Sequence, residues 1–306
     1  MKRTMAAIAI MASLCIARAD SLYFSSGVVT NYTNVTLTIH GPTNTVGVVE
    51  HYDRNTPGWS AIKTFTLNWT GQATVSADLD NTVYGIYRAY GTNTVGTNST
   101  ILYSTNAFGA CHGMLGAGRS MIGEPFGAQD ISEILPAPAE GTTVYRYNNS
   151  TTNYTVDSYS SGSWDGPLTV GQGIGTLIIA PSNSWQHFLV QGIFNTNQLW
   201  MNIGKGYSIL CSPLYQVVGS GYMQVDELNT NRLGGYSLLP VQTPGYNPQA
   251  TIQKMIDSAG NYRTYTLTNN VWQTSGTNTV IPLNIAEGFW LTKPTNTTWK
   301  VTMQIW

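Results

Sequence analysis

The chain has 306 residues, of which 9% are charged and 42% hydrophobic, and its formal net charge at pH 7 is −1. A typical soluble domain has about 25% charged residues. Nucleic-acid binding depends on clustered lysines and arginines, which this composition does not provide, so it argues against that function class. Low charge combined with 18 tyrosines favours a β-rich extracellular protein, long enough for two or three domains.

Residues 1–19 are predicted to form a secretory signal peptide. A basic start is followed by the apolar run 5–16 and by a small-x-small cleavage site at 17–19, in the order that such peptides require. The apolar run is too short for a membrane helix, and no other stretch approaches the ~20 apolar residues needed. We therefore expect cleavage before Asp20, export to the extracellular space or cell surface, and no membrane span.

Residues 20–106 are predicted to form a separate β-sandwich of immunoglobulin-like or fibronectin-like size. Apolar and polar residues alternate in the segments TNVTLTIHG, AIKTFTLNW, ATVSADL and TVYGIYRAY. This period of two is typical of half-buried strands.

A candidate calcium site follows the third of these segments. If the strand continues, Asp78 and Asp80 point to one face, where their oxygens and the carbonyl oxygen of Asn81 would bind a hard cation. Because a third acid and a loop glycine are missing from the segment, a solvated strand end is the alternative. We expect no other cofactor.

The stretch GRSMIGEPF, residues 118–126, looks like the elbow that carries the nucleophile of serine hydrolases. That elbow needs G-x-S-x-G, but here the second glycine comes one place late. The same pattern returns in GYSILCSPL from Gly206 and in GYSLLPVQTP from Gly235. We interpret all three as strands that a glycine opens, and Ser120 as a strand residue.

Two β-rich copies, each with a short helix, are predicted after residue 106. The first copy starts at Gly118 and places its helix at 130–135, where Asp130 would cap the start. The second starts at Gly235 and places its helix at 248–258. The matched positions are Leu168 with Leu283, Gly173 with Gly288, Pro181 with Pro294, and Trp185 with Trp299. We expect β-repeat domains at 107–205 and, with connecting strands, at 206–306, and thus an all-β fold of tandem sandwich domains.

Residues 102–306 resemble secreted β-repeat proteins of verrucomicrobial-type bacteria. The resemblance rests on LYSTNAFGACHGMLGAGRSMIGEPF, followed by ISEILPAPAEGTTVYRYNN, LTVGQG and a closing strand with a tryptophan. Such proteins have a G-x-S-L-I-x-N-P strand, an LP-x-x-P-x-G segment and G-E-G-F-F before the last strands. In this chain GQGIG replaces the glycine-aromatic turn of copy one, and copy two lacks the LP-x-x-P-x-G segment. The resemblance implies architecture and export, and no particular reaction.

Cys111 and Cys211 are the cysteines that remain after residue 19. In an oxidising compartment they would pair as a disulfide, and two buried free thiols are the alternative. Two cysteines without a nearby pair of histidines argue against structural zinc.

No catalytic set is assembled along the sequence. The histidines lack the spacing of metal ligands; they are His40, His51, His112 and His187. The carboxylates are scattered, and the sequence places no pair at the separation that a glycosidase needs. We expect a non-enzymatic protein, and an extracellular hydrolase with converging distant residues is a less favoured alternative.

Aromatic side chains are the candidate platforms for sugar rings. The candidates are Trp164, Trp185, Trp200, Trp272, Trp290, Trp299, Tyr145, Tyr147, Tyr154 and Tyr159. Trp164 and Trp272 lie in turns rich in Ser, Gly and Asn, so we expect them to be exposed and to contact a glycan. Because Trp185 and Trp299 occupy matched positions of the repeat, we expect them in the core.

These features favour a structural or adhesive protein of the cell surface or extracellular material. Its partners would be other copies of itself or extracellular polysaccharide, and a carbohydrate-binding module is the alternative function. Copies would pair through strand edges, whose backbone groups lack partners. The terminal WKVTMQIW has Lys300 as its one charged residue and is the expected edge.

Overall fold

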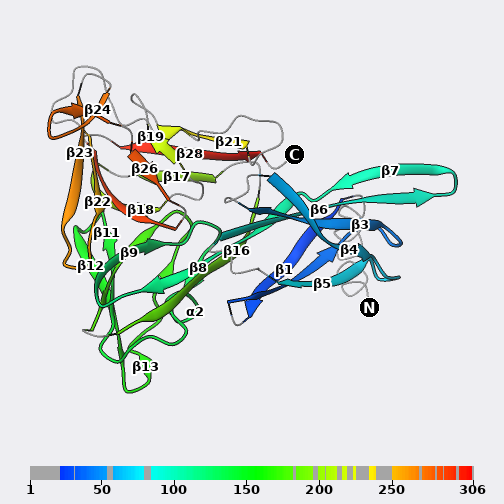
Figure 1. Cartoon of the computed structure of the whole chain (residues 1–306), viewed down its shortest axis with the longest axis horizontal. Coiled ribbons are helices and arrows are strands. Elements are labelled where there is room, and N and C mark those ends of the chain that lie inside the picture. The colour runs from blue at the N-terminus through cyan, green and yellow to red at the C-terminus, as the bar shows by residue number, and fades with distance from the viewer. Residues whose placement is uncertain are drawn as a thin grey trace, which may run out of the picture. The chain divides into compact units, whose positions relative to one another are not determined.

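A computed structural model of the chain describes residues 21–30, 32–53, 58–78, 84–181, 184–195, 199–203, 205–211, 216–218, 223–224, 234–238, 250–268, 271–279, 281–284, 286–293 and 296–304. Over these ranges the chain is nearly all β and forms several antiparallel sheets (Figure 1). The one helix in this part of the chain is the single turn α2 (Ile131–Ile134). The expected all-β class is confirmed. None of the helices described is long and apolar enough to cross a membrane.

The chain divides into two compact units. Unit 1 comprises Met1–Phe108 with Ile193–Asn195, and unit 2 comprises Gly109–Gly192 with Thr196–Trp306. The two β-repeat domains expected after residue 106 therefore fall largely within one unit.

Unit 1 is built from a small sheet and part of a larger one. The small sheet has the order β1-β2-β5, with β1 (Tyr23–Thr30), β2 (Asn34–His40) and β5 (Gln72–Asp78). The larger sheet has the order β16-β8-β6-β3-β4, with β7 beside β6. Its strands are β3 (Val46–Asp53), β4 (Gly58–Thr66), β6 (Tyr84–Val95), β7 (Asn98–Tyr103), β8 (Asn106–Leu115) and β16 (Gln186–Asn195).

The core of unit 1 follows the alternation seen in the sequence. Val35, Leu37 and Ile39 of β2 are fully buried, while the residues between them are half-buried. Burying each such side chain contributes about 1.5–3 kcal/mol, so this period of two fixes which face of the strand points inward.

Unit 2 contains two larger sheets with similar strand orders. The first has the order β13-β12-β11-β15-β9, with β9 (Gly118–Gly123), β11 (Thr143–Asn148), β12 (Asn153–Ser160), β13 (Ser163–Trp164) and β15 (Gly175–Ala180). The second has the order β18-β27-β22-β23-β24-β25, with β18 (Gly206–Cys211), β22 (Thr251–Met255), β23 (Tyr262–Thr268), β24 (Val271–Thr274), β25 (Thr277–Asn278) and β27 (Gly288–Lys293).

Smaller sheets complete unit 2. β10 (Gln129–Asp130) pairs with β14 (Thr169–Val170). The other two have the orders β17-β28-β21 and β20-β19-β26, with β17 (Leu199–Ile203), β19 (Gln216–Val218), β20 (Met223–Gln224), β21 (Gly234–Leu238), β26 (Ile281–Leu283) and β28 (Thr297–Gln304).

The strand that starts at Gly206 holds the place in the second sheet that β9 holds in the first. Gly123 at the end of β9 lies opposite Gly175, and Cys211 at the end of β18 lies opposite Gly288. The strand that starts near Gly235 lies instead beside β28. All three glycine-led segments are strands, as predicted, and Ser120 is a strand residue opposite Ile178.

One of the two expected helices is confirmed. Oδ1 of Asp130 accepts a hydrogen bond of 3.0 Å from the backbone N–H of Ser132 and caps α2. The prediction of a helix at 248–258 is wrong, because Thr251–Met255 forms strand β22, which pairs with β23 and β27. Ile252 and Lys254 are buried in alternation, so a period of two, imposed by the neighbouring strands, overrides the helix-like spacing of the apolar residues.

Two further expectations are overturned. The terminal strand β28 is not an edge, because Val301 pairs with Leu199 on one side and with Ser237 on the other. Trp185 is not a core residue, since 72% of its surface is exposed. The side chain of its matched residue, Trp299, lies outside the described part of the structure.

Candidate functional site

Aromatic rings from both larger sheets of unit 2 gather at one place, which we call the aromatic cluster. Its members are Tyr145, Tyr147, Tyr154, Tyr207 and Trp290. The ring of Trp290 lies 5.3 Å from that of Tyr147, 6.4 Å from that of Tyr154 and 6.3 Å from that of Tyr207. All these pairs have interplanar angles between 71° and 89°, the edge-to-face geometry that aromatic rings prefer.

The strand periodicity places these rings together. Tyr145 and Tyr147 are two residues apart on β11 and share a face, and Tyr154 of β12 lies directly opposite Tyr147. In β27, Trp290 stands between Phe289 and Leu291, which are fully buried. Trp290 therefore points away from the apolar core, towards the face that carries the tyrosines.

The aromatic cluster is open to solvent. Tyr154 is 44% exposed and Tyr207 is 53% exposed, while the other members are half-buried. Partial burial raises the pKa of Tyr154, and the nearby hydroxyls of Tyr262 and Tyr147 raise it further. Its hydroxyl is therefore neutral at physiological pH and is able both to donate and to accept a hydrogen bond.

Polar side chains continue this face across the second sheet. Trp290 lies opposite Gln253, which lies opposite Thr264 of β23. Nε2 of Gln253 donates a hydrogen bond of 3.2 Å to Oγ1 of Thr264. Amide and hydroxyl groups in neighbouring strands thus form a row that starts at the indole ring.

An open groove with a volume of about 550 Å³ lies on this sheet. The residues that line this polar groove are Ile256, Tyr262, Arg263, Thr264, Thr266, Gln273, Thr274, Ser275 and Gly276. Thr264 connects it with the aromatic cluster, because Thr264 lies opposite Gln253, which in turn lies opposite Trp290. The volume is within the range of roughly 300–1,000 Å³ that small-molecule sites occupy.

Charge is scarce around the polar groove. Arg263 is the one charged residue among those that line it, and the others are hydroxyl, amide, aliphatic or glycine residues. The arrangement suits an uncharged polar ligand with both apolar ring faces and hydroxyl groups.

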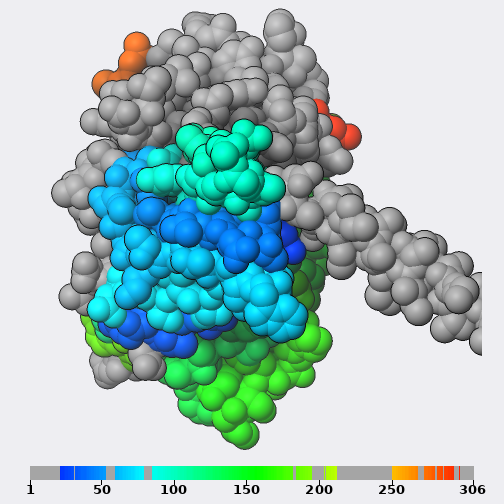
Figure 2. Space-filling model, turned by 90° about the vertical axis from the view of Figure 1, so that its right-hand side faces the viewer, coloured from blue at the N-terminus to red at the C-terminus, as the bar shows by residue number. Residues whose placement is uncertain are grey.

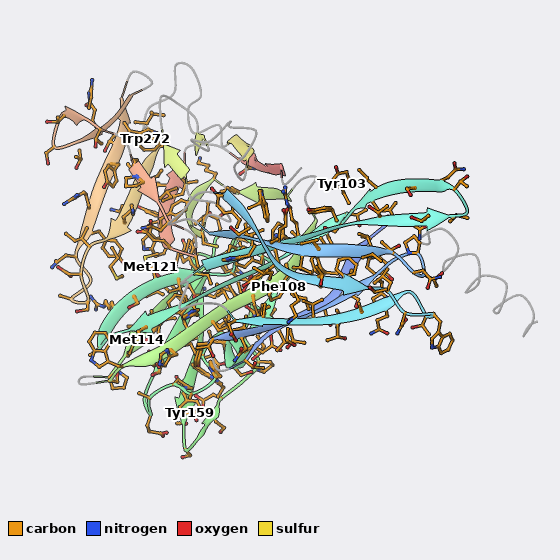
Figure 3. All side chains as sticks on the ribbon, turned by 45° about the vertical axis from the view of Figure 1, so that its right-hand side comes forward. Tyr103, Phe108, Met114, Met121, Tyr159 and Trp272 are labelled. Carbon is orange, nitrogen blue, oxygen red and sulfur yellow. The ribbon has the colours of Figure 1, made fainter. Side chains whose placement is uncertain are left out.

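The two tryptophans predicted to contact a glycan lie in different environments. Trp164 of β13 is half-buried, and its ring lies 5.4 Å from that of Tyr159. The prediction for Trp272 is wrong, because that residue, labelled in Figure 3, is 1% exposed and lies opposite Leu267 in the sheet. Ser275 and Gly276 do form the expected turn, but Trp272 precedes it in β24 and points into the core.

Four of its five members, Tyr145, Tyr147, Tyr154 and Trp290, are among the candidate platforms of the sequence, whereas Tyr207 is not. The expectation that turn residues are exposed favoured Trp164 and Trp272 over the aromatic cluster. The sequence signal that could have found it is the alternation of tyrosines in TVYRYN together with the tryptophan in EGFW. Only the packing of the first sheet against the second brings these segments together.

Of the three residues predicted to bind calcium, one lies in the described part of the structure. Asp78 is exposed at the end of β5, opposite Asn34, whereas Asp80 and Asn81 lie outside the described residues. Within the described ranges, no group of three His, Cys, Asp or Glu side chains is arranged to hold a metal ion.

Cys111 and Cys211 are buried free thiols. The predicted disulfide is therefore wrong, and the alternative of two buried free thiols is confirmed. Burial raises the pKa of Cys111 to about 12, and the nearby carboxyl of Glu124 raises it too. The pKa of Cys211 is also raised by burial and by Glu124. Thiols with such pKa values are protonated and unreactive.

Glu124 has the most perturbed carboxyl group in the described structure. It is fully buried, and burial raises its pKa to about 8. Its Oε1 accepts hydrogen bonds of 2.7 and 2.9 Å from the backbone N–H groups of Phe126 and Gly127. A perturbed pKa is often a sign of a catalytic acid, but this carboxyl holds a chain turn inside the core and has no access to solvent.

Comparisons with known protein families, with curated proteins and with solved structures find no match for this chain.

Proposed function

We propose that the chain is a secreted, non-enzymatic adhesive protein of the cell surface or extracellular material, which binds polysaccharide through the aromatic cluster and the polar groove. The observation that carries this proposal is the continuity of exposed rings with an open, uncharged row of hydroxyl and amide groups. The resemblance to secreted β-repeat proteins and the signal peptide expected at residues 1–19 support export.

Sugar rings need the two kinds of surface that meet here. The C–H faces of a pyranose are apolar and pack against aromatic rings, which combine a large apolar surface with a polar tip in Tyr and Trp. The hydroxyls around the ring edge need donors and acceptors, and Gln and Thr side chains supply both. Trp290 and Gln253, opposite each other in the sheet, provide the two surfaces side by side.

The open groove favours the middle of an extended chain as ligand. A pocket closed at one end would select chain ends, whereas this groove is open and has the exposed turn Ser275–Gly276 among the residues that line it. The low charge of its lining favours a neutral polysaccharide over an anionic one.

The test compares Trp290→Ala with Trp185→Ala. The control tryptophan is 72% exposed in the same unit but lies outside the aromatic cluster and the polar groove. Binding to neutral glucans, mannans and xylans and to anionic alginate is measured by isothermal titration calorimetry, and folding of each variant is checked by thermal melting.

We expect Trp290→Ala to weaken binding at least tenfold, because aromatic hot-spot residues contribute about 2 kcal/mol or more. Trp185→Ala should bind as the parent chain does. The proposal fails if the parent chain binds none of the polysaccharides, or if folded Trp290→Ala binds with unchanged affinity. Tyr207→Ala is a second variant. Because Tyr207 is exposed, its substitution leaves core packing intact, and a loss of polysaccharide binding would not result from misfolding.

A further inference from the structure

A long β-hairpin of unit 1 ends beyond the sheet to which it belongs. β6 and β7 pair from Tyr90 opposite Tyr103 to Val95 opposite Asn98, and β3 pairs with β6 only as far as Thr92. The last residues of the hairpin are therefore two-stranded. Figure 1 shows β7 running beside β6 to the tip, and the turquoise atoms of the hairpin face the viewer in Figure 2.

No described strand lies beside the outer edge of β7. Among the strands that the structure describes, β7 pairs with β6 alone. The turn between them is the two-residue loop 96–97, with Gly96 at a φ of 64°, as tight hairpins require. Because inward and outward hydrogen bonding alternates along an antiparallel strand from the closing pair Val95–Asn98, the backbone groups of Ser99 and Ile101 point outward.

This edge lacks the charges by which natural sheets block edge-to-edge pairing. Lys on an edge strand, inward-pointing charges and bulges are the usual protections. No Lys, Arg, Asp or Glu occurs between Arg88 and Arg119, a stretch that contains all of β7.

Two other edge strands of unit 1, β1 and β4, do carry such protection. β1 has an irregular register between Phe24 and Ser26, and the side chain of Asn106 forms hydrogen bonds with the backbone of Phe24 there. Oδ1 of Asn106 accepts a hydrogen bond of 2.7 Å from its N–H, and Nδ2 donates one of 2.9 Å to its C=O. β4 carries Lys63 and pairs with β3 across a register shift. The contrast singles out β7 as an edge left available for pairing.

Exposed aliphatic side chains lead across the sheet to the same edge. Val46 of β3, Thr92 of β6 and Ile101 of β7 lie in one cross-strand row. Val46 is 56% exposed and Ile101 is 61% exposed. Cross-strand pairs of β-branched residues stabilise antiparallel sheets, so a strand added beside β7 would extend this row.

We propose that the outer edge of β7 pairs with β7 of a second copy of this chain. An antiparallel strand edge is complementary to itself about a twofold axis, the symmetry of most dimers. A twofold axis brings identical charges of the two copies close to one another, so that they repel. β7 has no charged residue and therefore avoids this repulsion. The new strand pair makes one continuous sheet from the two hairpins and covers Ile101 of both chains.

The first experiment measures the mass of the purified chain by sedimentation equilibrium over a dilution series. We expect a reversible dimer for the parent chain. The variant Ile101→Lys puts a charge on the edge and should weaken dimerisation at least tenfold. The control Val28→Lys makes the same kind of change at a 48% exposed residue of β1 and should dimerise as the parent chain does. A monomeric parent chain at every concentration, or an undiminished Ile101→Lys dimer, overturns the proposal.

A second experiment identifies the edge independently of stability. The exposed Ser99 is replaced in Ser99→Cys, and the exposed Thr64 of β4 is replaced in Thr64→Cys as the control. Because Cys111 and Cys211 are buried, they contribute little background. Under mild oxidation Ser99→Cys should form a covalent dimer and Thr64→Cys should not. If the parent chain associates but Ser99→Cys forms no covalent dimer, the copies associate through another surface.

Discussion

The ring of Tyr147 on β11 lies 5.3 Å from the ring of Trp290 on β27, with an interplanar angle of 71°. This contact joins the two larger sheets of unit 2 at the aromatic cluster. Both residues are half-buried, so part of each side chain remains exposed to solvent. The same pair that packs one sheet against the other thus provides the proposed sugar platform.

Substitutions at Tyr147 should separate ring stacking from hydrogen bonding. Tyr147→Phe keeps the ring and should retain most of the affinity for polysaccharide. Tyr147→Ala removes it and should weaken binding about tenfold or more, since an anchoring ring of this kind is typically worth 2 kcal/mol or more. Calorimetric titration of both variants measures the difference, and equal affinities for the two would argue against stacking at this ring.

The buried carboxyl of Glu124 should make stability depend on pH. Its pKa is about 8 in the folded chain, against 4.5 for an ordinary glutamate. Since the folded chain binds this proton more tightly, the stabilisation is fully present below about pH 4.5 and is lost as the pH rises through about 8. Thermal melting between these values should show a falling midpoint.

Glu124→Gln should remove that dependence. A glutamine keeps an oxygen for the N–H groups of Phe126 and Gly127 and has no proton to lose. We expect this variant to melt higher than the parent chain at pH 8, with the difference disappearing near pH 4.5. Glu140→Gln changes the same charge at an exposed residue and serves as the control. A parent chain whose melting midpoint does not fall relative to Glu124→Gln would contradict the assignment.

Trp272 and Trp164 should respond differently to truncation. Trp272 is 1% exposed, and Trp272→Ala should lower the free energy of unfolding by about 3–5 kcal/mol, as truncation of a buried aromatic residue does. Trp164 is half-buried beside Tyr159, so Trp164→Ala should cost only about 1 kcal/mol. Urea unfolding measures both values. If Trp164→Ala also lost polysaccharide binding while remaining folded, the glycan contact predicted for Trp164 would be supported.

The thiols of Cys111 and Cys211 should be inert in the folded chain. Both are buried, and burial raises the pKa of each, so the reactive thiolate is scarce. A thiol reagent should label neither residue under native conditions and both after denaturation. A reducing agent should leave the melting midpoint unchanged, whereas a drop in that midpoint would indicate a disulfide.

The sequence by itself determined the fold class and many of the strands. Alternation of apolar and polar residues is local, so Val35, Leu37 and Ile39 already mark a half-buried strand without knowledge of its partners. The capped helical turn after Asp130 is likewise local, because its cap and first residues are adjacent in sequence.

The tertiary structure alone decided which strands are neighbours, and with them the site. Ile252 and Met255 have the spacing of a helix, yet pairing with β23 and β27 makes the segment a strand. Trp272 stands beside a turn but faces the core, while Trp290 alternates with core residues and faces solvent. Pairing partners depend on contacts between distant segments, whose closure entropy and packing no local pattern records. For that reason β7 has an open edge among the described strands whereas the terminal strand does not, and the aromatic cluster exists only in the folded chain.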